Sequence, residues 1–223
     1  MKYLIYTLLL AIFTSCTSQK KTSQIKEIQP LTQLKSLVDT LTIEEKNIVN
    51  DFLDIELACE RYKNYNNLEI IMIEDAGNGI ENLSAYEYAY RDFHSDGNEV
   101  TAENKERFGW ILDSLQIKEL KNKYSDKKEY HWKSSDIRNF KVNIMKNDTL
   151  RNYLKKDRFI DLSEKLVLFI KKPIIIDEKN AFISIATRKG FLFGSVISNY
   201  TALMKKTNKK WKTGASYWDG SIE

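Results

Sequence analysis

Two glutamates stand one helical turn apart in the first predicted helix, residues 42–62. At 100° per residue, Glu56 and Glu60 fall within the apolar stripe that Val49 and Phe52 define, not opposite it. If they face a cleft, such paired carboxylates bind a cation or a polar ligand, or perform acid–base hydrolysis at separations of ~5–9 Å. In the alternative interpretation, both reach the edge of the core and pair with arginine, lysine or tyrosine hydroxyls, because an unpaired buried carboxylate is prohibitive.

Other patterns for catalysis are missing from the sequence. It contains no Gly-x-Ser-x-Gly turn, no glycine-rich phosphate loop and no His-x-x-x-His pair. His94 and His131 stand in separate polar segments, and we expect two unconnected surface histidines; the alternative is that they converge on a metal with Asp92 or Asp96. The sequence therefore predicts no catalytic residue, no metal site and no cofactor.

The tryptophan side chains are a second set of candidate binding residues. Tryptophan at amphipathic spacing is more often part of a core than of a groove, and Trp211 is predicted to point inward from its strand. Trp218, near the end of the chain, is expected to be exposed. Trp218 therefore joins Glu56 and Glu60 as a candidate binding residue.

The first sixteen residues have the order of a secretory signal. Lys2 supplies positive charge, residues 4–13 are apolar, and Thr14 and Ser15 are small residues at the end of that stretch. The stretch is about half the ~20 apolar residues that a spanning helix needs, and no later stretch is long enough. We expect export without a membrane span.

Phe13, Thr14, Ser15 and Cys16 resemble the lipobox of bacterial lipoproteins, although that family usually has Leu or Val in place of Phe13. The resemblance implies that lipid is attached to the Cys16 thiol and that the chain is cut after Ser15. Two or three acyl chains would make the attachment effectively permanent. The alternative is an ordinary secretory signal with an accidental cysteine. The implied organisation is a cleaved signal peptide at residues 1–15, a lipidated cysteine and flexible tether at 16–41, and a single folded domain at 42–223.

The cysteine count and the charge restrict the remaining possibilities. Cys16 and Cys59 are the only cysteines, so lipid on Cys16 leaves Cys59 without an intramolecular partner, and it is expected to be a small buried hydrophobe. The formal net charge is only +4. The lysine clusters at 205–206 and 209–212 are therefore interpreted as a solvated face, and no nucleic acid is predicted as a partner.

The pattern of elements predicts an α+β fold, with N-terminal helices packed on a C-terminal antiparallel β-meander of about four strands. Helices are expected over residues 42–62, 85–93 and 102–124, and Thr42 with Glu45 is predicted to form a capping box at the start of the first. Short strands are expected over residues 68–73 and 141–145. The four strands of the meander are expected over residues 166–176, 181–187, 196–205 and 210–218. Pro173 places the first of these at an edge or bends it.

The C-terminal part resembles the close of many small, uncharacterised lipoproteins of Bacteroidota. The residues that carry the resemblance are Lys172, Pro173, Ile174, Asp177, Ala181, Phe182, Ile183, Gly190, Gly194, Ser195, Leu203, Lys205, Lys206, Lys210, Trp211, Lys212 and Trp218, with Asn50 to Leu53 on the first helix. The resemblance implies a location in the cell envelope and no particular chemistry.

We therefore expect a non-catalytic, lipid-anchored domain that binds a protein or an envelope component. The alternatives are an envelope hydrolase that uses Glu56 and Glu60, and an immunity-type lipoprotein that carries a large exposed patch instead of a pocket. In some Bacteroidota lipoproteins, an acidic stretch soon after the acylated cysteine directs the protein to the cell surface. The segment 18–21 contains no acidic residue, so the resemblance implies the periplasmic face of the outer membrane, with the cell surface as the alternative.

Overall fold

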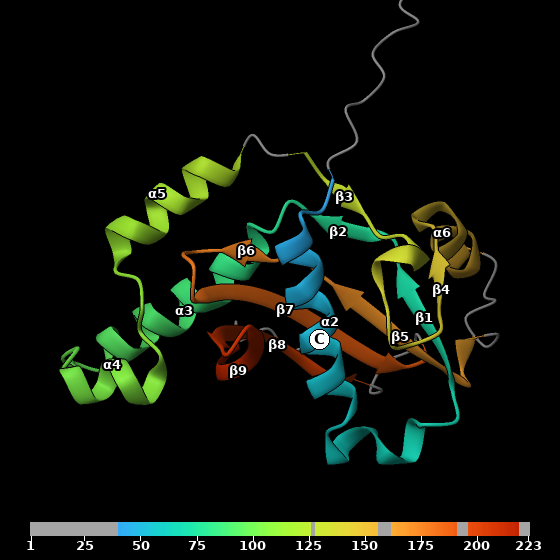
Figure 1. Cartoon of the computed structure of the whole chain (residues 1–223), viewed down its shortest axis with the longest axis horizontal. Coiled ribbons are helices and arrows are strands. Elements are labelled where there is room, and N and C mark those ends of the chain that lie inside the picture. Colours follow the sequence, from blue (N-terminus) through green and yellow to red (C-terminus); the bar gives the residue numbers. More distant parts are fainter. Residues whose placement is uncertain (1–39, 126–127, 156–161, 191–195, 219–223) are drawn as a thin grey trace, which may run out of the picture. The chain divides into compact units, whose positions relative to one another are not determined.

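A computed structural model describes residues 40–125, 128–155, 162–190 and 196–218 (Figure 1). The predictions for the signal peptide, for Cys16 and for most of the tether lie outside these ranges. Within these ranges the chain forms both helices and strands, as predicted, but the strands are arranged differently from the prediction.

The first described helix, α2 (Ile43–Leu57), begins one residue after the predicted start, because Thr42 is its N-cap. Thr42 and Glu45 form the capping box: the Glu45 N–H donates to Thr42 Oγ1 at 3.1 Å, and the Thr42 N–H donates to Glu45 Oε2 at 2.7 Å. Ile48 and Phe52 are completely buried. The helix ends earlier than predicted, and a 3-10 turn, η1 (Glu60–Tyr65), follows it.

The main sheet is mixed and has seven strands, so the predicted antiparallel meander of about four strands is only its C-terminal part and not the whole sheet. Its strands are β1 (Glu69–Ile73), β4 (Val142–Met145), β5 (Lys165–Ile170), β6 (Ile174–Ile175), β7 (Asn180–Lys189), β8 (Val196–Thr207) and β9 (Lys210–Tyr217). The order is β4-β1-β5-β7-β8-β9, and β6 pairs with β7. The C-terminal strands are antiparallel as predicted, whereas β1 runs parallel to both β4 and β5.

The composition of β1 explains its central place. Its sequence is Glu-Ile-Ile-Met-Ile, and its last three residues are all buried, Met72 toward one face and Ile71 and Ile73 toward the other. A continuous apolar run of this kind is typical of a strand covered on both faces. A separate two-stranded sheet pairs β2 (Asp75–Gly77) with β3 (Tyr130–His131).

Pro173 divides the strand predicted at residues 166–176. Ile170 in β5 pairs with Ile185, and Ile174 in β6 pairs with Phe182, so both short strands lie along the same edge of β7. Proline has no N–H to donate, which explains why regular pairing stops between them.

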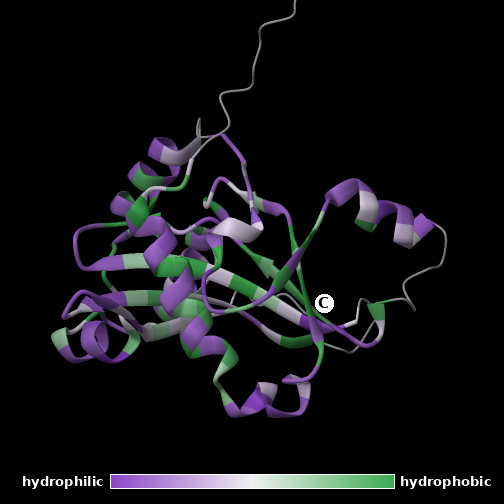
Figure 2. Cartoon of the chain, turned by 45° about the vertical axis from the view of Figure 1, so that its right-hand side comes forward, coloured by the Kyte–Doolittle hydropathy of each residue, from purple (hydrophilic) through white to green (hydrophobic). Residues whose placement is uncertain are grey.

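Helices cover both faces of the main sheet. In Figure 1, α2 crosses the strands on the near side, and its residues pack with Ile183, Ile185 and Met204. On the other face, α3 (Glu81–Ser95) packs against Phe182 and Leu203. A short helix, α6 (Asn147–Lys155), packs Leu150 against Ile71, Ile73 and Val167. Hydrophobic colour in Figure 2 is concentrated in the strands and hydrophilic colour on the helices.

The helix predicted at residues 102–124 is two helices, α4 (Ala102–Phe108) and α5 (Ser114–Ser125). Gly109 ends the first one in the left-handed region, at φ 67°. Its carbonyl accepts a 2.8 Å hydrogen bond from the Tyr217 hydroxyl, which ties this turn to β9.

Candidate functional site

The structure does not bring the two predicted carboxylates together. Glu56 lies near the end of α2 and is 1% exposed, whereas Glu60 opens η1 and pairs with Lys63 at 2.9 Å. The side chain of Glu60 is 84% exposed. The expected stacking required a helix that continued to Tyr62, and the helix ends at Leu57, so no paired-carboxylate cleft forms.

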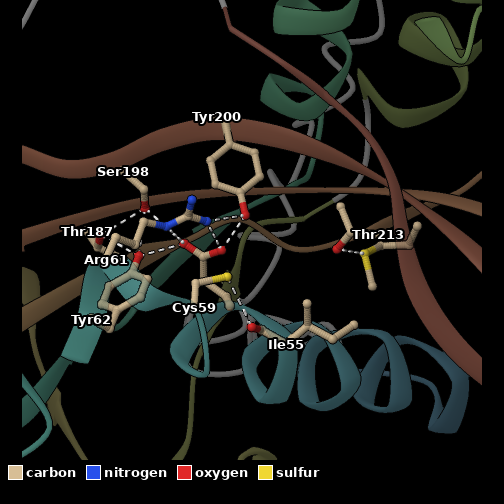
Figure 3. A network of polar contacts seen from close by, with 10 residues as sticks. Ile55, Cys59, Arg61, Tyr62, Thr187, Ser198, Tyr200 and Thr213 are labelled. Carbon is tan, nitrogen blue, oxygen red and sulfur yellow. Dashed lines mark hydrogen bonds and ion pairs between the residues drawn. The ribbon is translucent and has the colours of Figure 1, made fainter. Parts of the chain in front are cut away.

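Glu56 is the centre of a buried polar network. Its partners Arg61, Tyr62, Ser198 and Tyr200 are labelled in Figure 3. Its Oε1 accepts hydrogen bonds from the Tyr62 hydroxyl at 2.6 Å, from Ser198 Oγ at 3.1 Å and from Arg61 Nε at 3.2 Å. Its Oε2 accepts from Arg61 Nη2 at 2.5 Å and from the Tyr200 hydroxyl. A carboxylate offers about four lone-pair sites, so the five donors saturate it. For Glu56 the structure therefore confirms the interpretation of a core-edge residue paired with arginine and tyrosine.

The network also connects three separate segments of the chain. The Tyr62 hydroxyl lies 2.8 Å from both Thr187 Oγ1 on β7 and Ser198 Oγ on β8. Burial, followed by the hydrogen bond to Glu56, raises the pKa of Tyr62 to about 12, and the same two causes raise the pKa of Tyr200. Both hydroxyls consequently keep their protons and act as donors at neutral pH. The network fixes η1 to the sheet.

A pocket of about 370 Å³ lies on the opposite face of the sheet and is named here the β7–β8 pocket. Ile183 and Ile185 of β7 face α2, so Ser184, Ala186 and Arg188 between and after them face the other side. The pocket is lined by Glu81, Ala85, Phe169, Lys171, Ser184, Ala186, Arg188, Asn199 and Thr201. Ile185 and Tyr200, which pair with each other between these strand residues, also border it. Its volume is within the ~300–1,000 Å³ typical of small-molecule sites.

The position of the pocket follows from the side chains of this face. At one end, α3 packs on the large residues Phe182 and Leu203, and at the other, α6 packs on Val167. Between them, Ser184 stands opposite Thr201 and Ala186 opposite Asn199. These four residues are small or polar, so none of the described helices covers this part of the sheet and a concave surface remains between α3 and α6.

The polar groups of the pocket have definite positions. Ser184 Oγ and Thr201 Oγ1 lie 2.5 Å apart on its floor. Lys171 Nζ lies 3.7 Å from Glu81 Oε1, and both side chains are partly exposed, at 33% and 49%. The Arg188 guanidinium lies 6.0 Å from the centre of the Phe169 ring. The pocket thus combines two cations, one carboxylate, two hydroxyls and an aromatic wall.

No single segment of the sequence contains this site. Its residues come from α3, from β5 and the residue after it, and from β7 and β8, and their convergence depends on the strand order. A usable signal was the alternation in β7, where Ser184, Ala186 and Arg188 interrupt Ile183, Ile185 and Thr187 with period two.

The remaining candidate residues lie apart from the pocket. Trp218 is 53% exposed and Trp211 is 2% exposed, as predicted for their positions, but neither lines the pocket. Cys59 is a free, half-buried thiol that packs beside the core of α2. Among the described residues, no group of three His, Cys, Asp or Glu side chains is placed to hold a metal ion.

The lysine clusters contact acidic side chains of α2. Lys206 Nζ lies 2.5 Å from Glu44 and 5.5 Å from the centre of the Trp211 ring, and Lys210 Nζ lies 3.4 Å from Asp51. None of the helices in the described ranges is both long and apolar enough to span a bilayer. No protein-family model, no curated protein and no solved structure matches this chain.

Proposed function

We propose that this chain is a lipoprotein of the bacterial cell envelope whose folded part is a non-catalytic binding domain, with the β7–β8 pocket as its ligand site. Lipid on Cys16 would hold it on a membrane. The order of Lys2, the apolar residues 4–13 and Cys16 supports the anchor. The absence of acidic residues at 18–21 favours the periplasmic face of the outer membrane, with the cell surface as the alternative.

The observation that supports binding is the pocket itself. It is concave, its wall is formed by Phe169 and Ala186, and Lys171 and Ser184 supply polar groups, which is the usual composition of a small-molecule site. Hydrolysis by Glu56 and Glu60 is not favoured, because Glu56 is saturated by protein donors and Glu60 is exposed to solvent and paired with Lys63.

An immunity-type role would require a broad exposed surface. The large exposed apolar residues of the described ranges are Ile43, Ile55, Tyr88, Leu115, Val196 and Trp218. They belong to α2, α3, α5, β8 and the residue after β9, so their distribution does not favour one docking patch over the pocket.

The anchor is tested by growing cells that express the full chain with an alkyne-labelled fatty acid and then separating the membranes. Wild-type protein is expected to carry the label and to sediment with membranes, whereas Cys16→Ser is expected to lose both properties. Cys59→Ser is the matched control and is expected to retain them. Equal labelling of the wild type and Cys16→Ser would reject the anchor.

The ligand site is tested by thermal unfolding of the full chain with a library of neutral sugars, amines and organic acids. At least one class is expected to raise Tm, and filling the pocket by Ala186→Phe or Asn199→Phe is expected to abolish the rise. Circular dichroism checks that each variant is folded. The pocket is rejected as a ligand site if no compound raises Tm, or if the filled variants respond like the wild type.

A further inference from the structure

The β7–β8 pocket offers more hydrogen-bond donors than acceptors. Lys171 and Arg188 supply cationic donors and Asn199 an amide, whereas Glu81 is the only carboxylate in the lining. The ionisable side chains of the lining are therefore two cations and one carboxylate. On the basis of the proposed function, we infer that this pocket binds a small organic acid, with its anionic group at Lys171 and an apolar or ring face on Phe169.

The hydroxyl pair on the floor contributes a further donor. Ser184 Oγ and Thr201 Oγ1 are hydrogen-bonded to each other, and either can be the donor. Two hydroxyls hold two protons, and only one proton lies between the two oxygens. Within the described part of the chain, neither hydroxyl has a second hydrogen-bond partner, although Thr201 is only 2% exposed. The second proton is thus available to an acceptor atom of a ligand.

The ion pair at the rim is weak enough to be exchanged. Lys171 and Glu81 approach to 3.7 Å and are both partly exposed, and pairs of this kind contribute little to stability. A ligand anion that approaches Lys171 competes with a long contact to Glu81, not with a buried one. When a ligand replaces Glu81 as the partner of Lys171, a neutral ligand gains less than an acid does, because only the acid forms a shorter hydrogen bond between two charged groups.

The positions of the two cations set the size of the ligand. The Lys171 N–H donates to the Ser184 carbonyl at 3.0 Å, so Lys171 is level with Ser184. Arg188 is four residues further along β7, which corresponds to about 13 Å of strand. Phe169 pairs with Ala186, midway between them. An acid with a ring or a short apolar body fits this spacing, since its charged end lies near a cation while its body covers Phe169.

The experiment compares matched compounds on the full chain by thermal unfolding and calorimetry. The probes are arylalkanoic and sugar acids, their neutral amides or parent sugars, and the corresponding phosphate esters. At 100 times Kd, an acid is expected to raise Tm by about 5–10 °C, and its neutral partner is expected to raise it far less. Comparison of carboxylates with phosphates identifies which anion the pocket prefers.

Variants test the two cations directly. Lys171→Gln is expected to weaken acid binding at least about tenfold, and Arg188→Gln is expected to weaken it less, because Arg188 lies beyond Phe169 at the far end of the pocket. Lys189→Gln is the matched control, because it removes the same charge one residue further along β7, where the side chain points to the other face. Circular dichroism again checks folding.

The possible outcomes separate this inference from the proposed function. If neutral compounds bind as well as acids and the filled variant Ala186→Phe blocks both, the pocket is a ligand site but the inference of an acid is wrong. Equal weakening by Lys189→Gln and Lys171→Gln would also reject the inference, because net charge alone would then explain binding. Stabilisation that Ala186→Phe does not change would reject the pocket itself.

Discussion

The carboxylate of Asp51 on α2 accepts a 2.9 Å hydrogen bond from the backbone N–H of Trp211 on β9. Asp51 is 7% exposed, and β9 is the last strand of the sheet. An edge strand normally presents unpaired N–H groups to solvent, where another chain can add to it. Here Asp51 on α2 accepts from the N–H of Trp211, near the start of β9. The same hydrogen bond therefore positions α2 and keeps this N–H from pairing with another chain.

Asp51→Ala is expected to lower the free energy of unfolding by about 1–3 kcal/mol, because the buried Trp211 N–H loses its acceptor. Asp51→Asn retains an acceptor oxygen and is expected to cost less. Urea unfolding of the two variants measures the difference. Equal losses would show that the hydrogen bond to Trp211 is not the important interaction of Asp51.

Glu56→Ala is expected to cost about 3 kcal/mol, because Tyr62 and Tyr200 lose a buried acceptor and Arg61 loses its ion pair. The partial exposure of Arg61, at 41%, keeps the loss at the lower end for a broken buried pair. The control is Glu60→Ala, which is expected to change stability by less than about 0.5 kcal/mol. If chemical unfolding gave the same loss of stability for both variants, the stabilising role of the network around Glu56 would be rejected.

Stability is expected to fall as pH rises above 10. The folded-state pKa of Tyr62 is raised to about 12 by burial and by the hydrogen bond to Glu56, while an unfolded tyrosine titrates near 10. The unfolded chain therefore releases this proton first, and the contribution is lost as pH rises from 10 to 12, by at most about 1.4 kcal/mol per pH unit. Tyr62→Phe is expected to flatten the fall in urea titrations at pH 9–11. Tyr88→Phe, an exposed substitution on α3, should leave the slope as it is.

Gly109→Ala is expected to destabilise the protein more than Gly97→Ala. Both glycines have positive φ, 67° and 75°, so both variants carry the backbone cost of about 1 kcal/mol. A Cβ on Gly109 would lie 2.7 Å from the Tyr217 hydroxyl, whereas one on Gly97 would have no neighbour within 4 Å. Thermal unfolding of the two variants isolates the steric part. A smaller loss for Gly109→Ala would mean that the α4–α5 turn moves freely away from β9.

Local signals in the sequence predicted individual elements well. Thr42 and Glu45 placed the start of α2, because a capping box involves only neighbouring residues. Strand-like runs of residues likewise located β7, β8 and β9. Helical periodicity correctly placed Glu56 among buried residues, but its stacking on Glu60 depended on where the helix ends.

Long-range pairing was not predictable from the same signals. Nothing in residues 69–73 indicates that their neighbours are β4 and β5, since strand partners are chosen by packing across the whole sheet. The polar sequence of α6 also gave little indication of the helix that covers Val167. The β7–β8 pocket depends on both features, so its residues could not be grouped before the sheet was known.

The insertion of β1 between β4 and β5 has a consequence for how the chain folds. Ile70 in β1 pairs with Val142 on one side and with Leu166 on the other, both contributed much later in the sequence. During synthesis, this apolar strand emerges long before either neighbour and has two open edges until then. Contacts of high sequence separation also slow folding. We therefore expect a slow folder that needs protection from aggregation while its amino-terminal half waits for the rest.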